Sequence, residues 1–323
     1  MKEIPIKKKH HYVWSFYLKQ WEKKGKVWYR TQKNNISQDS VKGLSQLPNF
    51  YKINPLTSED VKYINMWPVS GTDSLKEFQA SQLDFFTNIS KIISASQQHQ
   101  KFSKIKEAQH IIKALTHNSL EDTHAIIEKL ALPIIKELVK GNGDCLSTTA
   151  NMVSFCNFIG HQLLRTRKLK ELMFEAMQNI GSNDSERKIF ADLFIKNWWF
   201  LSYRLGTNVG QNLFTHVGTE FHTFVHNNTS IDFITTDQPV INIHDSVRHS
   251  TIGSPPPKEM DIYYPLSPRY AYIISKSDKF NHLQNCTDPA TVQDLNTRMA
   301  EKAHINIYGT SRESLMGLVA RRP

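Results

Sequence analysis

The chain is poor in cysteine and has no long apolar run. Its 323 residues include three cysteines, Cys145, Cys156 and Cys286, and an odd number at wide spacing fits neither a disulfide framework nor a zinc-binding pattern. No apolar stretch approaches the roughly 20 residues that a membrane helix needs, and the charged N-terminus lacks the apolar region of a signal peptide. We therefore expect a cytoplasmic protein in a reducing compartment, with no membrane as a partner.

Three common motifs of nucleotide-binding and hydrolytic enzymes are also missing. The chain has no Gly-x-x-x-x-Gly-Lys-Ser/Thr loop, no Gly-x-Gly-x-x-Gly turn after a strand and no Gly-x-Ser-x-Gly segment. These absences leave P-loop nucleotide hydrolysis, dinucleotide binding and the nucleophile elbow of serine hydrolases without support. We expect no cofactor.

Positive charge is concentrated at the start of the chain. The first 33 residues carry ten Lys or Arg and two acids, which supplies +8 of the net charge of +10. The same stretch holds seven aromatics: Tyr12, Trp14, Phe16, Tyr17, Trp21, Trp28 and Tyr29. Cations attract phosphates whatever the base sequence, and flat rings can stack on unpaired bases. This pattern favours a nucleic-acid partner, RNA more than DNA. The plainer interpretation is a loose basic arm, residues 1–9, followed by a helix whose aromatics lie in the core.

Helical and β-type patterns occupy different parts of the chain. Apolar residues recur at helical spacing from 11 to 21 and through most of 57–205, which predicts helices there. Residues 26–31 have the composition of a strand, and 34–40 that of a polar loop. Further predicted strands lie at 220–226, 231–236, 261–265, 269–275 and 305–308.

This distribution predicts an α+β fold. A helical middle, about 57–205, accompanies a mixed or antiparallel sheet that is built from the N-terminal strand and the C-terminal strands. We expect a single domain over 1–323, with a possible helical subdomain at 57–205 and a β-rich part at 218–310.

Five segments, taken in order, carry a resemblance to a known family. They are His-Tyr-Val-Trp-Ser-Phe-Tyr-Leu at 11–18, Gln-Leu-Leu-Arg-Thr at 162–166, Phe-Ile-Thr-Thr-Asp-Gln-Pro-Val at 233–240, Tyr-Pro-Leu-Ser-Pro at 264–268, and a closing helix with Asn296. The ordered set resembles the bacterial domain-of-unknown-function family numbered 4238 over nearly the whole chain. That family usually has proline where Trp14 stands, and either residue suits the first turn of a helix. The resemblance implies a shared fold and a shared residue cluster, but no reaction.

The same segments predict one polar site gathered from distant parts of the chain. The candidate catalytic residues are His11, Arg165, Asp237 and Asn296, and the candidate substrate-binding residues are Gln162, Ser267, Arg269, Lys7, Lys8 and Lys9. Histidine can move protons near neutral pH, and a guanidinium can pair with a carboxylate or a phosphate. Each residue also has a structural interpretation. Asp237 before Gln238-Pro239 can hold a turn, Arg165 can neutralise Asp237, and His11 can cap its helix.

A metal site is a weaker interpretation of the histidines. His216, His222 and His226 lie within eleven positions, beside Glu220. No cysteine is near them and the His-Glu-x-x-His order is missing, so exposed strand histidines are favoured and no metal is assigned.

Two functional hypotheses follow, with a small-molecule hydrolase as a distant third. The first is a nucleic-acid-directed hydrolase, an RNA-cleaving effector of a bacterial defence or toxin system that works without a metal. In it, His11 activates a ribose 2′-hydroxyl, and Arg165 or Arg269 stabilises the developing charge. Asp237 orients His11 or Arg165. The second is a non-enzymatic protein that binds nucleic acid or a protein partner such as an antitoxin. Burial of the polar set discriminates between them, because a sealed network cannot act on a substrate.

Overall fold

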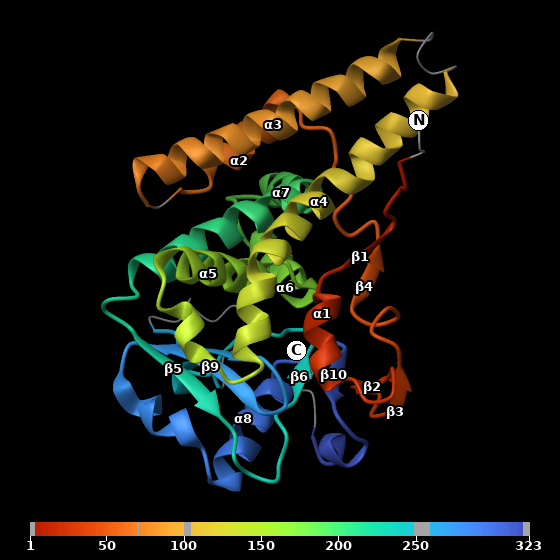
Figure 1. The fold of residues 1–323 in the computed structure, drawn as a ribbon. Helices are drawn as coiled ribbons and strands as arrows, with labels where there is room; N and C mark the ends of the chain where they lie inside the picture. Colours follow the sequence, from red (N-terminus) through yellow and green to blue (C-terminus); the bar gives the residue numbers. More distant parts are fainter. Residues whose placement is uncertain (1–3, 70, 100–104, 249–258, 319–323) are drawn as a thin grey trace.

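The computed structural model describes residues 4–69, 71–99, 105–248 and 259–318, and has a helical layer above a β-rich layer (Figure 1). The helices are α1 (Ser15–Leu18), α2 (Ser58–Met66), α3 (Asp73–Gln98), α4 (Lys106–Leu138), α5 (Thr149–Leu164), α6 (Arg167–Met177), α7 (Asp184–Thr215) and α8 (Pro289–Glu301). Short 3₁₀ segments include η1 (Lys19–Trp21) and η6 (Glu313–Leu315). All but α1 and α8 of these α-helices fall in the middle of the chain. This confirms the predicted α+β class.

Capping side chains explain where several helices begin. Thr57 accepts from the backbone N–H of Asp60, whose carboxylate in turn accepts from the N–H of Thr57, so the two form a capping box at α2. Thr72, Asn183 and Asp288 accept in the same way from the first turns of α3, α7 and α8. These helix starts therefore follow from local sequence.

Helices α5 and α7 touch through glycine. A Cβ atom added to Gly160 would lie 2.3 Å from the carbonyl oxygen of Gly206 and 2.5 Å from the backbone nitrogen of Gly210. Neither backbone atom can move out of the way, so only glycine permits this approach. The contact holds the C-terminal half of α5, which carries His161, Gln162 and Arg165, deep in the molecule.

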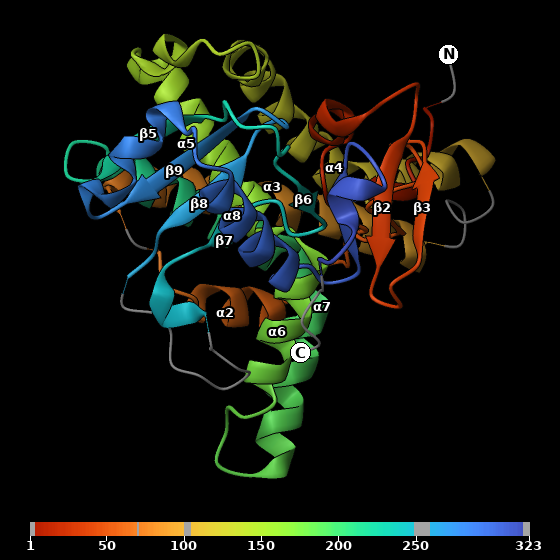
Figure 2. The ribbon, with the colours of Figure 1, turned by 90° about the horizontal axis from the view of Figure 1, so that it is seen from below.

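The strands form three antiparallel sheets. Their orders are β1 (Lys9–His11) with β4 (Gln46–Pro48); β3 (Ile36–Asp39), β2 (Val27–Thr31), β10 (Asn306–Gly309) and β6 (Thr235–Thr236); and β5 (Phe221–His226), β9 (Tyr270–Ser275), β8 (Ile262–Pro265) and β7 (Ile241–Asn242). In the second sheet Tyr308 pairs with Tyr29 on one side and with Thr235 on the other. The N-terminal strand thus joins the C-terminal strands, as predicted. Figure 2 shows β2 and β3 to one side of the third sheet, which α8 covers.

The first segment is more firmly held than the predicted arm. Within residues 4–9, the backbone N–H of Lys7 donates to Oδ1 of Asn118 at 2.9 Å, and Nδ2 of Asn118 donates to the carbonyl of Pro5 at 2.9 Å. Residues 1–3 of the predicted arm lie outside the described residues. The predicted helix over 11–21 is replaced by the end of β1, then α1 and η1. Tyr17 and Trp21 are fully buried, so these aromatics belong to the core and cannot stack on bases.

Two local predictions were wrong in detail. Residues 34–40 contain β3 instead of a loop, because a polar segment is tolerated at the exposed edge of a sheet. The predicted strand at 231–236 is reduced to β6, since Ile234 and Asp232 use backbone groups to bond Asn296 instead of a neighbouring strand. Within the described ranges, no helix has both the length and the apolar character required to cross a bilayer.

Candidate functional site

The structure divides the predicted site residues among three places. His11, Gln162 and Arg165 gather between β1, α4 and α5, in what we call the Arg165 cluster together with Glu121, Glu128, His124 and His161. Asp237 holds a backbone turn at the start of β10. Ser267, Arg269 and Asn296 lie around a surface pocket beside Asp232. The single site expected from the sequence is therefore not formed.

Arg165 sits at the C-terminal end of α5 and is 1% exposed. Its Nη2 atom lies 2.6 Å from Oε1 of Glu128 on α4. With the Gln162 amide oxygen facing the guanidinium, Nε of Arg165 donates to that oxygen at 2.9 Å. Burial acts to lower the pKa of Arg165, but Glu128, Tyr51 and Glu121 together outweigh burial and the net shift is upward. Arg165 is therefore a permanent cation held inside the protein.

The histidines around this cation are kept neutral. Burial lowers the pKa of His11, and Arg165 lowers it further. Nε2 of His11 is buried and meets no hydrogen-bond partner among the described residues. Burial also takes the pKa of His124 well below its usual value and that of His161 to about 3. By contrast, His10 uses both ring nitrogens, on the carbonyl of Lys7 and the N–H of Tyr51. Of these four residues, His11 is partly exposed and the other three are buried, although the unpartnered Nε2 atom of His11 is itself buried.

Carboxylates occupy the more open side of the cluster. Burial raises the pKa of Glu121 to about 7; Arg165 opposes that rise and Glu128 adds to it. Burial likewise raises the pKa of Glu128. Lys7 pairs with Asp122 at 2.5 Å, and its charge also acts on both glutamates. A neutral imidazole, a half-protonated carboxyl and a lysine thus surround one buried guanidinium.

Sequence reasoning missed the residues that α4 contributes. His117, Glu121, His124 and Glu128 are spaced by four, three and four positions, which puts them on one face of a helix. That face also carries buried Leu120 and Ile127. A polar stripe at helical spacing on an apolar face was the signal that could have identified them.

Asp237 has a structural task in this fold. Its carboxylate accepts from the backbone N–H groups of His304 at 2.8 Å, Ile305 at 2.6 Å and Asn306 at 3.2 Å. Burial raises its pKa, and these donors oppose the rise. The adjacent Gln238 accepts from the hydroxyl of Thr166, next to Arg165. Asp237 therefore fixes the entry to β10 and orients neither His11 nor Arg165 through these bonds.

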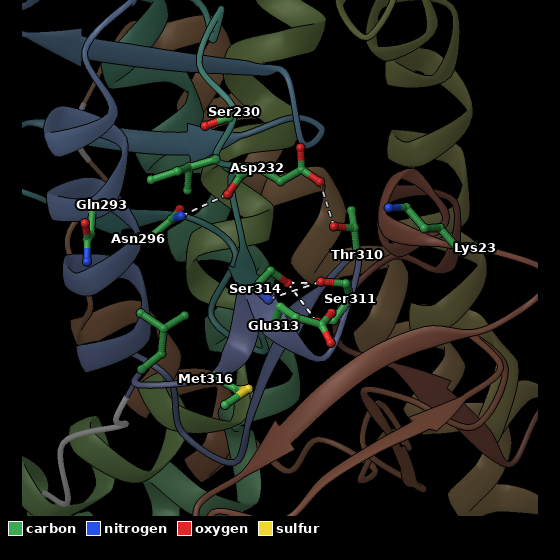
Figure 3. Close-up of a pocket in the computed structure, with 12 residues that line it drawn as sticks. Lys23, Ser230, Asp232, Gln293, Asn296, Thr310, Ser311, Glu313, Ser314 and Met316 are labelled. Atoms are coloured by element: carbon green, nitrogen blue, oxygen red, sulfur yellow. Dashed lines mark hydrogen bonds between the residues drawn. The ribbon is translucent and has the colours of Figure 1, made fainter.

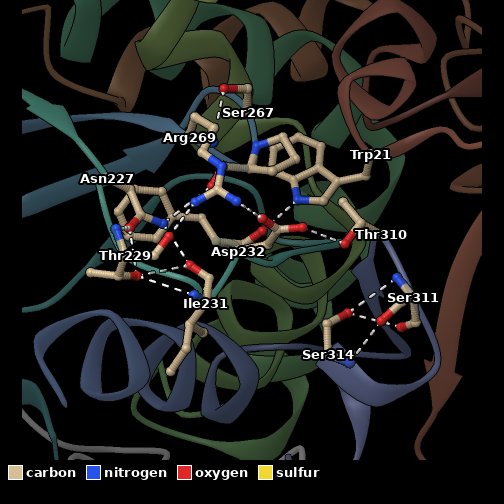
Figure 4. Close-up of polar contacts among 12 residues, drawn as sticks. Trp21, Asn227, Thr229, Ile231, Asp232, Ser267, Arg269, Thr310, Ser311 and Ser314 are labelled. Carbon is tan, nitrogen blue, oxygen red and sulfur yellow. Dashed lines mark hydrogen bonds and ion pairs between the residues drawn. The ribbon is translucent and has the colours of Figure 1, made fainter. Parts of the chain in front are cut away.

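Three more of the predicted residues, Ser267, Arg269 and Asn296, belong to the surroundings of Asp232, and Figure 4 shows Ser267 and Arg269 there. Oδ1 of Asp232 lies 2.9 Å from Nη2 of Arg269, and Oδ2 accepts from the hydroxyl of Thr310 at 2.6 Å. Asn296 donates through Nδ2 to the carbonyl of Asp232 and accepts from the N–H of Ile234. Ser267 accepts from the N–H groups of the two residues at 269 and 270, so it holds a turn that presents Arg269.

These contacts border a cavity of about 400 Å³, which we call the Asp232 pocket (Figure 3). Its walls contain both polar and apolar side chains, from Lys23, Ser230, Ile231, Asp232, Gln293, Asn296, Thr310, Ser311, Glu313, Ser314, Met316 and Leu318. Among the described residues that line the pocket there is no histidine and no member of the Arg165 cluster. It has the size of a small-molecule site, and its ionisable lining residues are Lys23, Asp232 and Glu313.

The three histidines considered for a metal are separate in their contacts. Nδ1 of His216 bonds the carbonyl of Asn212, Nδ1 of His222 lies 3.1 Å from the Tyr272 hydroxyl, and His226 stacks on Tyr270. Over the described part of the chain, no group of three or more His, Cys, Asp or Glu side chains is arranged to hold a metal ion.

The comparisons with known proteins agree with the resemblance seen in the motifs. Residues 9–313 match the family described as "Protein of unknown function (DUF4238)", and the chain belongs to that family. No curated protein and no solved structure was found to match the chain.

Proposed function

We propose that this member of the DUF4238 family cleaves RNA without a metal, as the effector of a bacterial defence or toxin system. The observation that supports this is the opposite pKa shift of two groups around Arg165. His11 is shifted downward and Glu121 upward to about 7. A free base and a protonated acid then coexist near neutral pH, the arrangement that acid–base catalysis requires. RNA in preference to DNA, and a protein partner such as an antitoxin, belong to the same proposal.

The proposed reaction uses the ribose 2′-hydroxyl as the nucleophile. Because Nε2 of His11 is buried, the scheme requires the cluster to open toward the substrate. Nε2 of His11 then accepts the hydroxyl proton, O2′ bonds to phosphorus, and the bond from phosphorus to O5′ breaks. Protonated Glu121 donates its proton to the leaving O5′. The products are a 2′,3′-cyclic phosphate and a 5′-hydroxyl, so no external oxidant or metal is needed.

Other residues take revised roles in this scheme. Lys7, with a side chain 42% exposed, is placed to attract the phosphate, and exposed Lys8 and Lys9 add to the positive charge. Arg165 is buried, so it acts as a positioning residue that holds Glu128 and adds to the lowering of the His11 pKa by burial. The scheme assigns no step to Asp237, whose oxygens are engaged by backbone donors.

The test is cleavage of end-labelled RNA by the purified chain. We expect His11→Ala and Glu121→Gln each to lower the rate by about 100-fold or more, the usual contribution of a proton-transferring group. The matched control is His216→Ala, which changes an exposed histidine just after the end of α7 and should retain the rate. Chelator should have no effect, and the product should end in a cyclic phosphate. Equal cleavage by all four proteins would end the proposal.

The pH dependence gives an independent readout. Activity needs neutral His11 and protonated Glu121, so the rate should rise through the lowered pKa of His11 and fall above about pH 7 as Glu121 ionises. The residual activity of Glu121→Gln should no longer fall above about pH 7, because the glutamine cannot ionise. An alkaline decline that persists in this variant would assign it to another group.

One observation favours the non-enzymatic alternative. Arg165 is 1% exposed and ion-paired, which suits a structural network as well as a catalytic one. In this case the chain binds nucleic acid or a protein through its basic surface, with no turnover. Two results together would support this alternative. The logarithm of the affinity for RNA should fall linearly with the logarithm of the salt concentration, and no cleavage product should form.

A further inference from the structure

The Asp232 pocket presents three chemically different walls. Asp232 and Thr310 make one wall, Ile231 and Met316 contribute to an apolar one, and Lys23 stands at the rim. Figure 3 shows Lys23 beyond Thr310, and Met316 on the other side of the turn that contains Ser311. A ligand that fills the pocket therefore needs a hydrogen-bonding part, an apolar part and an anionic part.

The Asp232 carboxylate is oriented but not saturated. Its side chain is 20% exposed, and among the described residues each of its oxygens has one partner, Arg269 for Oδ1 and Thr310 for Oδ2. A carboxylate can accept about four hydrogen bonds, so about two positions remain. Two hydroxyl groups on neighbouring carbons can donate to both oxygens at once. Because Asp232 repels anions, a phosphate is disfavoured at this end of the pocket.

The apolar wall suits a flat ring. Ile231, Met316 and Leu318 line the pocket, and Met316 is 59% exposed. An exposed methionine is polarisable and adapts its shape to an aromatic partner. A ring placed there would remove this apolar surface from water.

The lysine at the rim is presented by a rigid turn. Lys23 and Lys26 bond each other through both backbone N–H groups, at 2.8 and 3.1 Å. Lys24 and Gly25 between them have φ of 52° and 78°, the signature of a tight type I′ turn. Lys23, Lys24 and Lys26 are all exposed. The turn therefore holds positive charge at the mouth of the pocket, where it can meet a phosphate.

We propose that the Asp232 pocket binds a ribonucleotide. The 2′,3′-diol of the ribose bonds Asp232, the base lies against Met316, and the phosphate faces Lys23. A free mononucleotide and the 3′-terminal nucleotide of an RNA chain share this chemistry, since both have a free diol. The pocket shares no residue with the Arg165 cluster, so this inference does not depend on RNA cleavage.

Binding of AMP, measured by calorimetry or ligand-observed NMR, tests the proposal. We expect AMP to bind the wild-type chain about tenfold more tightly than 2′-deoxy-AMP, which lacks one hydroxyl, and more tightly than adenosine, which lacks the phosphate. Asp232→Asn should remove the preference for ribose over deoxyribose. Lys23→Ala, which changes an exposed residue and tests the site even where Asp232→Asn fails to fold, should remove the preference for AMP over adenosine. Lys33→Ala, at another exposed lysine of the N-terminal segment, is the matched control and should bind as wild type.

The source of the nucleotide is resolved by a second comparison. A short RNA with a 3′-terminal diol is measured against the same RNA with a 3′-phosphate, in the His11→Ala background so that the result is independent of cleavage. A preference for the diol end identifies the RNA terminus, and equal weak binding with tight AMP binding identifies the free nucleotide. The proposal is overturned by a lack of AMP binding at millimolar concentration, or by equal affinity for AMP and 2′-deoxy-AMP.

Discussion

The Arg165 cluster and the Asp232 pocket have the same central unit, an arginine paired with a carboxylate, but they bury it differently. Arg165 is 1% exposed, whereas the side chain of Arg269 is 45% exposed. The partners Glu128 and Asp232 are similar, at 18% and 20%. The closed pair, Arg165 with Glu128, lies in a buried environment that lowers the pKa of His161 to about 3 and raises that of Glu121 to about 7. Arg165 adds to the first shift and opposes the second. The open pair leaves acceptor positions for a ligand.

The largest expected effect is on the closed pair. Arg165→Met leaves Glu128 and Gln162 without their partner in a buried site, so the free energy of unfolding should fall by about 3–5 kcal/mol. Chemical denaturation at neutral pH measures this change. A loss below 1 kcal/mol would show that water reaches the pair and that the cluster is not closed.

Glu121 should make the free energy of unfolding depend on pH, with an effect smaller than that of Arg165→Met and larger than that of Arg269→Met. Its pKa in the folded protein, about 7, is above its ordinary value of 4.5, so the folded state holds a proton that the unfolded state releases between these pH values. Stability from this group is therefore present below pH 4.5 and lost as pH rises through 7.

The variant that tests this is Glu121→Gln, which cannot ionise. It should match wild type near pH 4.5 and exceed it by about 2 kcal/mol at pH 8.5, a value reduced for partial exposure. Asp84→Asn, at an exposed position on α3, is the control and should show no such trend. A constant difference between Glu121→Gln and wild type at all pH values would contradict the assignment.

The open pair should matter less to stability. Arg269→Met removes a half-exposed ion pair with Asp232 and a bond to the carbonyl of Thr229, so we expect a loss of about 1 kcal/mol. Denaturation run beside Arg165→Met gives the direct comparison. Equal losses in the two variants would remove the distinction between a closed and an open pair.

The smallest expected effect on stability is at the rim of the pocket. Lys23→Ala changes an exposed side chain, so the free energy of unfolding should stay within about 0.5 kcal/mol of wild type. The same variant should weaken AMP binding, as described above. A large loss of stability in Lys23→Ala would mean that this lysine supports the turn instead of a ligand.

Much of the fold could be predicted because its signals are local. The caps Thr57, Thr72 and Asn183 act on N–H groups three residues away, and the strand at 26–31 is visible in its composition. The edge strand β3 was not predicted, because a polar strand is indistinguishable from a loop until its partner β2 is known. The candidate site was predicted only in part, because its residues too depend on partners that the local sequence does not identify.

The assembly of the site depends on contacts between residues far apart in the chain. Arg165 meets Glu128 from a different helix, and Arg269 meets Asp232 across a turn, although the sequence motifs predicted both arginines in one place. Spacing along the chain therefore determined the α+β class, most helix starts and the kinds of side chain available. Tertiary packing, including the close approach of α5 and α7 at Gly160, decided which of them are sealed and which face water. Burial depends on every element packed around a residue, and no local pattern contains that information.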